Sequence, residues 1–241
     1  MPLINRSTCS LLALGLLLAA CGNEPETTET ADDSAAATEE ATGDSLEAVA
    51  DADAEATPAP APAGVDYAVA ESGTYTPDDG HAYIVFSYNH LGFSNPMVRW
   101  GDWDANLNWD ADNPENSTLD VTIDATSVDT GVDDFNTHLN SSDFFNTAEY
   151  PQISFTSTAL EVTGPESGIL TGDLTIRDTT MPVTMDVTIN KAGFEERGNV
   201  HKLGFSGRTT VLRSDFGLDA YVPNVSDEVD IIVEAEFEKP A

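Results

Sequence analysis

Hydrophobic and polar residues alternate with a period of two over most of the chain beyond residue 65. In residues 102–110, for example, Trp103, Leu107 and Trp109 share one face, while aspartate and asparagine occupy the other. This alternation is typical of strands with one buried and one solvated face, and it favours antiparallel pairing. The pattern predicts eight strands, at residues 81–90, 102–110, 119–126, 152–162, 169–177, 182–190, 202–213 and 228–238.

Residues that favour turns are expected to separate these strands, at 78–80, 112–115, 163–168 and 191–193. One short helix is predicted within residues 134–145, where Phe144 and Phe145 are expected to plug one end of the fold. The predicted strands exceed the usual length of about five or six residues, which suits a tall barrel. The fold class is therefore all-β, with a β-sandwich as the structural alternative. An eight-stranded barrel can enclose one small ligand.

The first twenty residues follow a different pattern. A basic Arg6 precedes an apolar run at 11–20 that is shorter than the roughly twenty residues needed to span a bilayer. This arrangement is typical of a secretory signal. Its last residues, with Cys21, resemble the lipobox of bacterial lipoproteins, which predicts a lipidated Cys21 that anchors the protein to a membrane. The alternative is an ordinary signal peptide in which Cys21 is incidental.

Residues 21–64 are predicted to form a disordered tether. Beyond Cys21 this segment holds 12 acidic and no basic residues and ends in alternating proline and alanine, so it cannot bury a core. We interpret it as a spacer between the membrane and a domain at 65–241, with an acidic docking tail as the alternative. Gly22 rather than aspartate after the cysteine resembles the sorting signal of enteric lipoproteins, which implies the outer membrane of a bacterial envelope, facing the periplasm.

Charge and cysteine content exclude several functions. The chain has 43 acidic and 9 basic residues, a formal net charge of −34, whereas nucleic-acid binding requires clustered cations. Residues 65–241 alone hold 31 acidic and 8 basic residues, a net charge of −23. Cys9 leaves with the predicted signal and Cys21 carries lipid, so the mature domain keeps no thiol for catalysis, a disulfide or a metal.

Several short motifs resemble, in order and spacing, those of the YceI-like family of lipocalin-like, polyisoprenoid-binding proteins. The resemblance covers about residues 74–239 and implies an extended eight-stranded antiparallel barrel with a small helix. It also implies an apolar channel that holds an isoprenoid chain, and it allows a homodimer. The Arg-Asp pair that the family carries before His138 is replaced here by Phe135 and Asn136, and the arginine expected after Leu139 is replaced by Asn140. The motifs lie at 81–92, 127–131, 138–145, 150–157, 171–176, 213–217 and 225–229.

The apolar face of the predicted strands must line the barrel interior. We therefore expect non-catalytic storage or transport of an isoprenoid-type lipid, such as a quinone or a polyprenol, with no resident cofactor. Each isoprene unit has five carbons, and its burial is worth roughly 4 kcal/mol before ordering costs. The same side chains could instead fill a closed core. The candidate ligand-binding residues are Phe86, Tyr88, Trp103, Leu107, Ile123, Phe155, Leu174, Ile176, Met185, Val187, Phe205 and Ile231.

Other functions are weaker interpretations of the same sequence. The four histidines are scattered and no HExxH or GxSxG motif occurs, so no catalytic residues are assigned. His90 is expected to be a core histidine, and Arg213 is expected to pair internally with Asp215. Residues 102–113 imitate an EF-hand loop, but Leu107 replaces its glycine and Asn113 its glutamate, so no metal site is assigned. The remaining alternative is an envelope scaffold whose filled barrel binds another protein through its loops.

Overall fold

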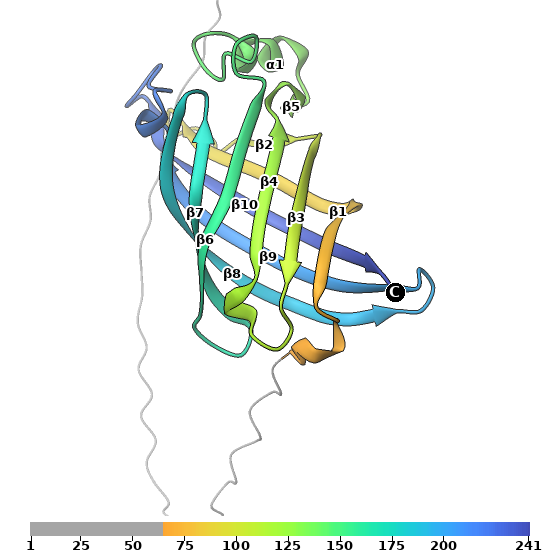
Figure 1. Ribbon diagram of the computed structural model, residues 1–241. Helices are drawn as coiled ribbons and strands as arrows, with labels where there is room; N and C mark the ends of the chain where they lie inside the picture. Colours follow the sequence, from red (N-terminus) through yellow and green to blue (C-terminus); the bar gives the residue numbers. More distant parts are fainter. Residues whose placement is uncertain (1–64) are drawn as a thin grey trace, which may run out of the picture. The chain divides into compact units, whose positions relative to one another are not determined.

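The computed structural model of the protein describes residues 65–241, which form a β-barrel with one α-helix (Figure 1). The predicted signal, the lipidated Cys21 and the tether lie outside the described residues. Short 3-10 helices occur at Tyr67–Val69, Pro114–Asn116, Ala125–Ser127 and Arg213–Phe216. The strands are β1 (Gly73–His90), β2 (Met97–Trp100), β3 (Trp103–Trp109), β4 (Thr118–Asp124), β5 (Val128–Asp129), β6 (Gln152–Val162), β7 (Ser167–Ile176), β8 (Thr179–Glu195), β9 (Val200–Leu212) and β10 (Val225–Pro240), and the helix is α1 (Asp133–Asn140).

Eight strands close into an antiparallel ring in the order β1-β3-β4-β6-β7-β8-β9-β10. The ring closes because β1, with 18 residues, is long enough to pair on both edges. One edge pairs with β10, and the other pairs with β3 through residues 73–75 and with β2 through residues 84–87. The predicted barrel is therefore confirmed and the sandwich alternative is wrong. The short strands β2 and β5, which the alternation did not predict, extend the sheet beside β1.

Two of the predicted turns are wrong, because residues 78–80 lie inside β1 and residues 191–193 lie inside β8. The pairing of β1 with β10 shifts register between Pro77 and Ala82, and that of β8 with β9 shifts between Ile189 and Lys191. A bulge inserts residues into one strand and bends it without ending the ladder. Turn-favouring residues at these places therefore curve two long strands around the barrel.

The two ends of the barrel are packed differently. At the lower end in Figure 1, which we call the closed end, the 3-10 helix Tyr67–Val69 lies beside the start of β1. Ala70, Tyr75 and Leu203 have no exposed surface there. At the opposite end, which we call the open end, α1 and the segment around Arg213–Phe216 surround a large cavity. The closed end therefore resembles an ordinary protein core, whereas the open end does not.

Helix α1 is shorter than predicted and ends at Asn140, and the chain then turns back through Phe144 and Phe145. Phe145 is buried against Phe86 and Trp100, with ring centroids 6.2 and 5.8 Å apart. The expected aromatic plug therefore forms only in part at the open end, because Phe145 is buried there while Phe144 is half-buried and lines the large cavity. None of the helices within residues 65–241 is long and apolar enough to cross a membrane.

Candidate functional site

The barrel encloses an inner cavity of about 180 Å³. Side chains from all eight strands of the ring line it, and none of these side chains is charged. The cavity follows from the alternation, because every second residue of a half-buried strand points inward. Gly207 keeps part of this space free, since a Cβ there would lie 2.6 Å from the sulfur of Met185. Ten of the candidate residues line this cavity: Trp103, Leu107, Ile123, Phe155, Leu174, Ile176, Met185, Val187, Phe205 and Ile231.

A second, outer cavity of about 720 Å³ lies at the open end. The other two candidate residues, Phe86 and Tyr88, line it from β1. Most of the rest of its wall comes from α1, from the turn that follows α1 and from residues 211–231, and residues 90–100 and Ile176 complete it. The structure thus places all twelve candidate residues on one of two cavities, and their role in ligand binding stays a prediction.

The two cavities adjoin at Trp100, Ile176 and Ile231, which line both of them. The indole of Trp100 packs on Phe86 with ring centroids 4.8 Å apart. Its Nε1–H is buried and finds no acceptor among residues 65–241. A polar donor in this state is uncommon in folded proteins. Trp100 therefore lies between the inner and the outer cavity, and its indole N–H is a buried donor without a hydrogen-bond acceptor among the described residues.

Arg213 is the single arginine or lysine in the walls of the two cavities. Its Nε donates to the carbonyl oxygen of Ser226 at 2.8 Å and its Nη2 to that of Val225 at 3.1 Å, while Nη1 donates to Leu218. Burial lowers the pKa of this guanidinium from its ordinary value, and the nearby carboxylate of Asp227 acts in the opposite direction. The backbone thus holds a cation in the wall of the outer cavity.

Two expectations about this region are wrong. Within the described residues no ion pair joins Arg213 to Asp215, because the guanidinium is bonded to backbone carbonyls instead. His90 is exposed at the rim of the outer cavity rather than buried in the core. The register between β1 and β10 shifts after Tyr88, and Leu91 adopts a left-handed conformation, so the strand leaves the barrel at this point.

Several outer-cavity residues were missed by the sequence prediction. Trp100 lies on a strand of four residues, which is too short to show alternation. Leu218 and Tyr221 follow the last 3-10 helix in a loop that has no period. His138 was noted only as part of a motif, although the spacing of Phe135, His138 and Leu139 fits one face of a helix. That spacing is the one signal that could have found part of this wall.

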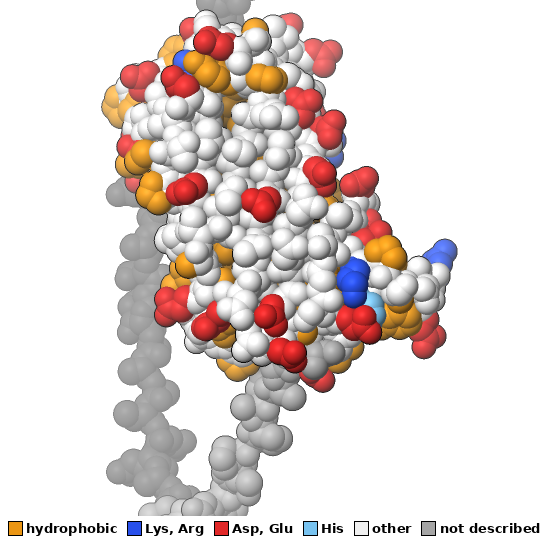
Figure 2. All heavy atoms as spheres, in the orientation of Figure 1, with side chains coloured by type: hydrophobic (Ala, Val, Ile, Leu, Met, Phe, Trp, Pro, Cys, Tyr) orange, Lys and Arg blue, Asp and Glu red, His pale blue; other side chains and the backbone are white. Residues whose placement is uncertain are grey.

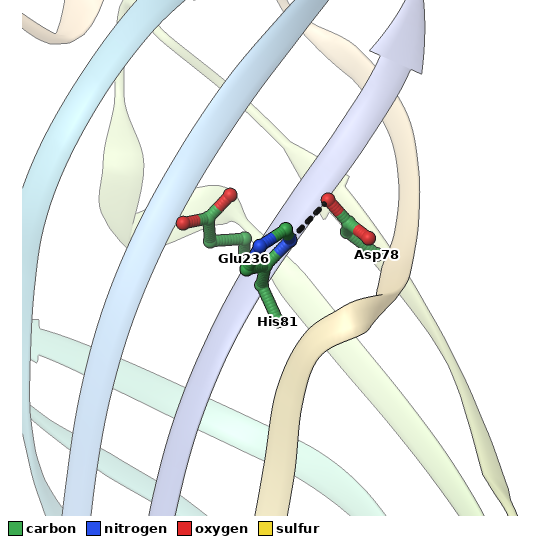
Figure 3. A group of neighbouring side chains, drawn as sticks. All are labelled: Asp78, His81 and Glu236. Carbon is green, nitrogen blue, oxygen red and sulfur yellow. Dashed lines mark hydrogen bonds and ion pairs between the residues drawn. The ribbon is translucent and has the colours of Figure 1, made fainter.

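A candidate metal cluster lies outside both cavities. Asp78, His81 and Glu236 bring one ligand atom each to within 4.8 Å of one another (Figure 3). The ammonium of Lys202 already lies 2.7 Å from Asp78 and 3.0 Å from Glu236. Hydrogen bonds from Lys202 and His81 lower the pKa of Asp78 to about 2. A metal ion would have to displace this ammonium, so the cluster is better explained as an ion-pair network at the bulge of β1.

Catalysis has little support from the titratable groups. The described carboxylates with a shifted pKa are Asp78, Asp110, Asp129 and Asp227, and in each case hydrogen bonds lower the pKa. None of the four lines the inner or the outer cavity. A general acid or base is typically held in a cleft with its pKa moved toward the working pH. These four carboxylates lie outside the cavities and their hydrogen bonds favour the ionised form, so they are better explained as structural groups.

Comparisons with known proteins agree with this architecture. Protein YceI of Escherichia coli O6:H1 is 37% identical over 169 residues, which cover 70% of this chain and 87% of that protein. The crystal structure of Campylobacter jejuni YceI superposes with a TM-score of 0.59 at 31% identity, over 64% of this chain and 90% of that one.

A more distant structural neighbour is a polyisoprenoid-binding domain from Saccharophagus degradans. It has a TM-score of 0.54 at 13% identity, and the match covers 70% of this chain and all of that domain, which shows a shared fold. The family model described as the YceI-like domain matches residues 75–237, which include every strand of the ring at least in part. The resemblance seen in the sequence motifs is therefore confirmed, and the chain belongs to the YceI-like family.

Proposed function

We propose that this protein binds an isoprenoid-type amphiphilic lipid, such as a quinone or a polyprenol, without covalent chemistry. The observation that carries the proposal is the pair of adjoining cavities, one uncharged and enclosed by the barrel, the other wider and partly polar. An amphiphilic lipid fits this arrangement, because its apolar tail can enter the uncharged inner cavity while its polar head stays in the outer cavity at the open end. The polyisoprenoid-binding domain of Saccharophagus degradans, which shares the fold, supports the choice of ligand.

The cavity volumes set how much tail fits. An apolar cavity of roughly 150 Å³ in another protein stays dry and accepts a benzene molecule, which has six carbons. The inner cavity of about 180 Å³ thus has room for about one five-carbon isoprene unit before any side chain moves. Met185 is unbranched and adaptable, so it offers a route to enlarge this space. The remaining units would extend through the junction at Trp100 into the outer cavity.

We also propose that lipidation at Cys21 tethers the barrel to the outer membrane on its periplasmic side. This part of the proposal depends on the sequence pattern at residues 11–22. An anchored barrel would meet its lipid at the membrane from which it loads or to which it delivers. Replacing Cys21 with serine should release the protein into the soluble fraction, as measured by fractionation of cells.

A scaffold that binds another envelope protein is the second candidate function. Phe93 and Met97 favour it, because 87% and 66% of their surfaces are exposed beside the open end. Large apolar side chains exposed together are a common feature of docking surfaces. This candidate requires no occupied cavity, so the experiment below separates the two functions.

The proposal is tested by purifying the full chain from a host that contains isoprenoid lipids and analysing its organic extract by mass spectrometry. We expect a stoichiometric isoprenoid lipid and saturable binding of added farnesol. Met185→Trp should remove most of this binding because the larger side chain fills the inner cavity. Thr184→Trp, on the outward face of the same strand, is the matched control and should bind normally. A protein that carries no lipid and takes up no farnesol would refute the proposal.

A further inference from the structure

The walls of the outer cavity have a charge opposite to that of the protein around them. About one residue in six of residues 65–241 is acidic, and Figure 2 shows these side chains spread over the visible face of the barrel. None of the residues that line the outer cavity is acidic, although the cavity is open and reaches the rim. Its titratable side chains other than tyrosine are Arg213, His90 and His138. Burial alone does not explain this, because acids are tolerated at an open rim.

The guanidinium of Arg213 has hydrogen-bond donors left for a ligand. A guanidinium has five N–H groups, and the three backbone carbonyls of residues 218, 225 and 226 accept from three of them. The carboxylates of Asp227 and Asp219 act on this cation through their charge without a hydrogen bond to it, and Asp227 accepts instead from the backbone N–H and the hydroxyl of Ser214 at 2.9 and 2.7 Å. The cation is therefore fixed in orientation, and two of its donors remain for a ligand.

Other groups around the cavity are suited to the same ligand. Tyr88 lines the cavity, and its hydroxyl has no hydrogen-bond partner among residues 65–241. The imidazole of His138 packs against Phe144 and Tyr221, with ring centroids 4.9 and 6.3 Å apart. Aromatic walls of this kind exclude water, and a charge interaction is stronger where the local dielectric is low.

From this arrangement we infer that the outer cavity binds an oxyanionic head group of the amphiphile, with Arg213 as its cationic partner and Tyr88 as a hydrogen-bond donor. The inference rests on the proposed function. It narrows the proposed ligand, an isoprenoid-type amphiphile, to one with an anionic head group, such as an isoprenoid phosphate. The end of the tail would occupy the inner cavity beyond Trp100, and the units nearer the head group would lie at the junction and in the outer cavity. The net negative charge of the barrel repels anions in general, so an anionic head group needs the fixed cation of Arg213 as a local partner.

The test compares two probes with the same tail, farnesol and farnesyl phosphate, in calorimetric titrations of the full chain. We expect farnesyl phosphate to bind at least about tenfold more tightly than farnesol, because a charge-assisted hydrogen bond to a guanidinium is stronger than a neutral one. Inorganic phosphate at millimolar concentration should not displace it, since the tail supplies much of the affinity. Strong competition by inorganic phosphate would mean that the site serves the free ion, and it would overturn the inference.

Variants test whether the preference for farnesyl phosphate over farnesol depends on Arg213 and Tyr88. Arg213→Gln should lower the affinity for farnesyl phosphate about tenfold and leave that for farnesol unchanged, and Arg213→Lys should restore part of the loss. Arg99→Gln removes the same charge from an exposed ion pair with Asp129 and is the matched control, for which no change is expected. Tyr88→Phe, which keeps the ring, should weaken only farnesyl phosphate binding. It serves as the second variant if Arg213→Gln does not fold.

The outcomes separate this inference from the proposed function. If neither probe binds the wild-type chain, the proposed function fails and the inference fails with it. If both bind with equal affinity, lipid binding stands and the anionic head group is refuted. Equal losses for the two probes in Tyr88→Phe or Arg213→Lys would also refute it, because they would indicate a structural role for these side chains.

Discussion

The closed and open ends of the barrel use the same strands for different purposes. At the closed end, Tyr75 and Leu203 have no exposed surface, and the Tyr75 hydroxyl donates to the carbonyl of Glu71 at 2.6 Å. At the open end, the wall of a cavity of about 720 Å³ includes two histidines, an arginine and several half-buried aromatic rings. If the open end binds a ligand as proposed, stability and recognition are separated along the barrel axis. Mutations at the closed end should then affect mainly stability, and mutations at the open end mainly binding.

The largest effect is expected when a leucine of β9 is replaced with alanine at each end and the loss in the free energy of unfolding is compared. Leu203→Ala, at the closed end of β9, should lower the free energy of unfolding by about 2–5 kcal/mol, because it leaves a cavity in a packed core. Leu212→Ala, at the open end of β9 and 43% exposed, should cost less than about 1 kcal/mol. Urea unfolding of both variants measures this. Equal costs would contradict the separation.

A smaller, pH-dependent effect is expected at the bulge beside the closed end. The pKa of Asp78 is about 2, below its ordinary value, because Lys202 and His81 donate hydrogen bonds to its carboxylate. Its contribution is therefore complete above about pH 4 and is lost as the pH falls through 2. Asp78→Asn should cost about 1 kcal/mol at pH 7, and this cost should shrink steadily below pH 4.

The control for this prediction is Asp79→Asn, which changes the exposed neighbouring residue in the same bulge. Unfolding curves of both variants and the wild type between pH 7 and pH 2 provide the comparison. A cost of Asp78→Asn that persists unchanged at pH 2 would show that the ion pair with Lys202 is not its source.

The smallest effect is expected at the open end, where Arg99 of β2 and Asp129 of β5 form an exposed ion pair at 2.9 Å. Water and salt screen such pairs, so Arg99→Gln should leave the urea midpoint unchanged within error. A clear loss of stability would show that β2 and β5 unfold together with the ring, and it would weaken the contrast between the ends.

The sequence was sufficient to predict the walls of the barrel because a period of two is a local signal. Each of the eight predicted strands corresponds to a strand of the ring, and the inward face was assigned correctly from Trp103 to Ile231. The bulges in β1 and β8 were mistaken for turns, since glycine and aspartate favour both. Only pairing with a neighbouring strand distinguishes the two cases, and pairing is a long-range property.

The open end was predictable only in part. The aromatic plug at Phe144 and Phe145 was expected from its motif, whereas the cation at Arg213 was assigned to the wrong partner. Its true partners are backbone carbonyls of residues 218, 225 and 226, and a carbonyl has no signature in the sequence. Loops also lack a period, so the part of the wall formed by the buried Leu218 and the exposed Tyr221 depends on how the chain returns across the barrel mouth.

Closure of the ring through the pairing of β1 with β10 has a consequence for kinetics. A continuous ladder of hydrogen bonds surrounds the interior, so a guest cannot leave sideways without breaking strand pairs. The closed end is filled by Tyr75 and Leu203, which leaves the mouth beside α1 as the exit. We therefore expect the residence time of the proposed ligand to depend on how readily α1 and the loop around Tyr221 move aside, rather than on the strands of the ring.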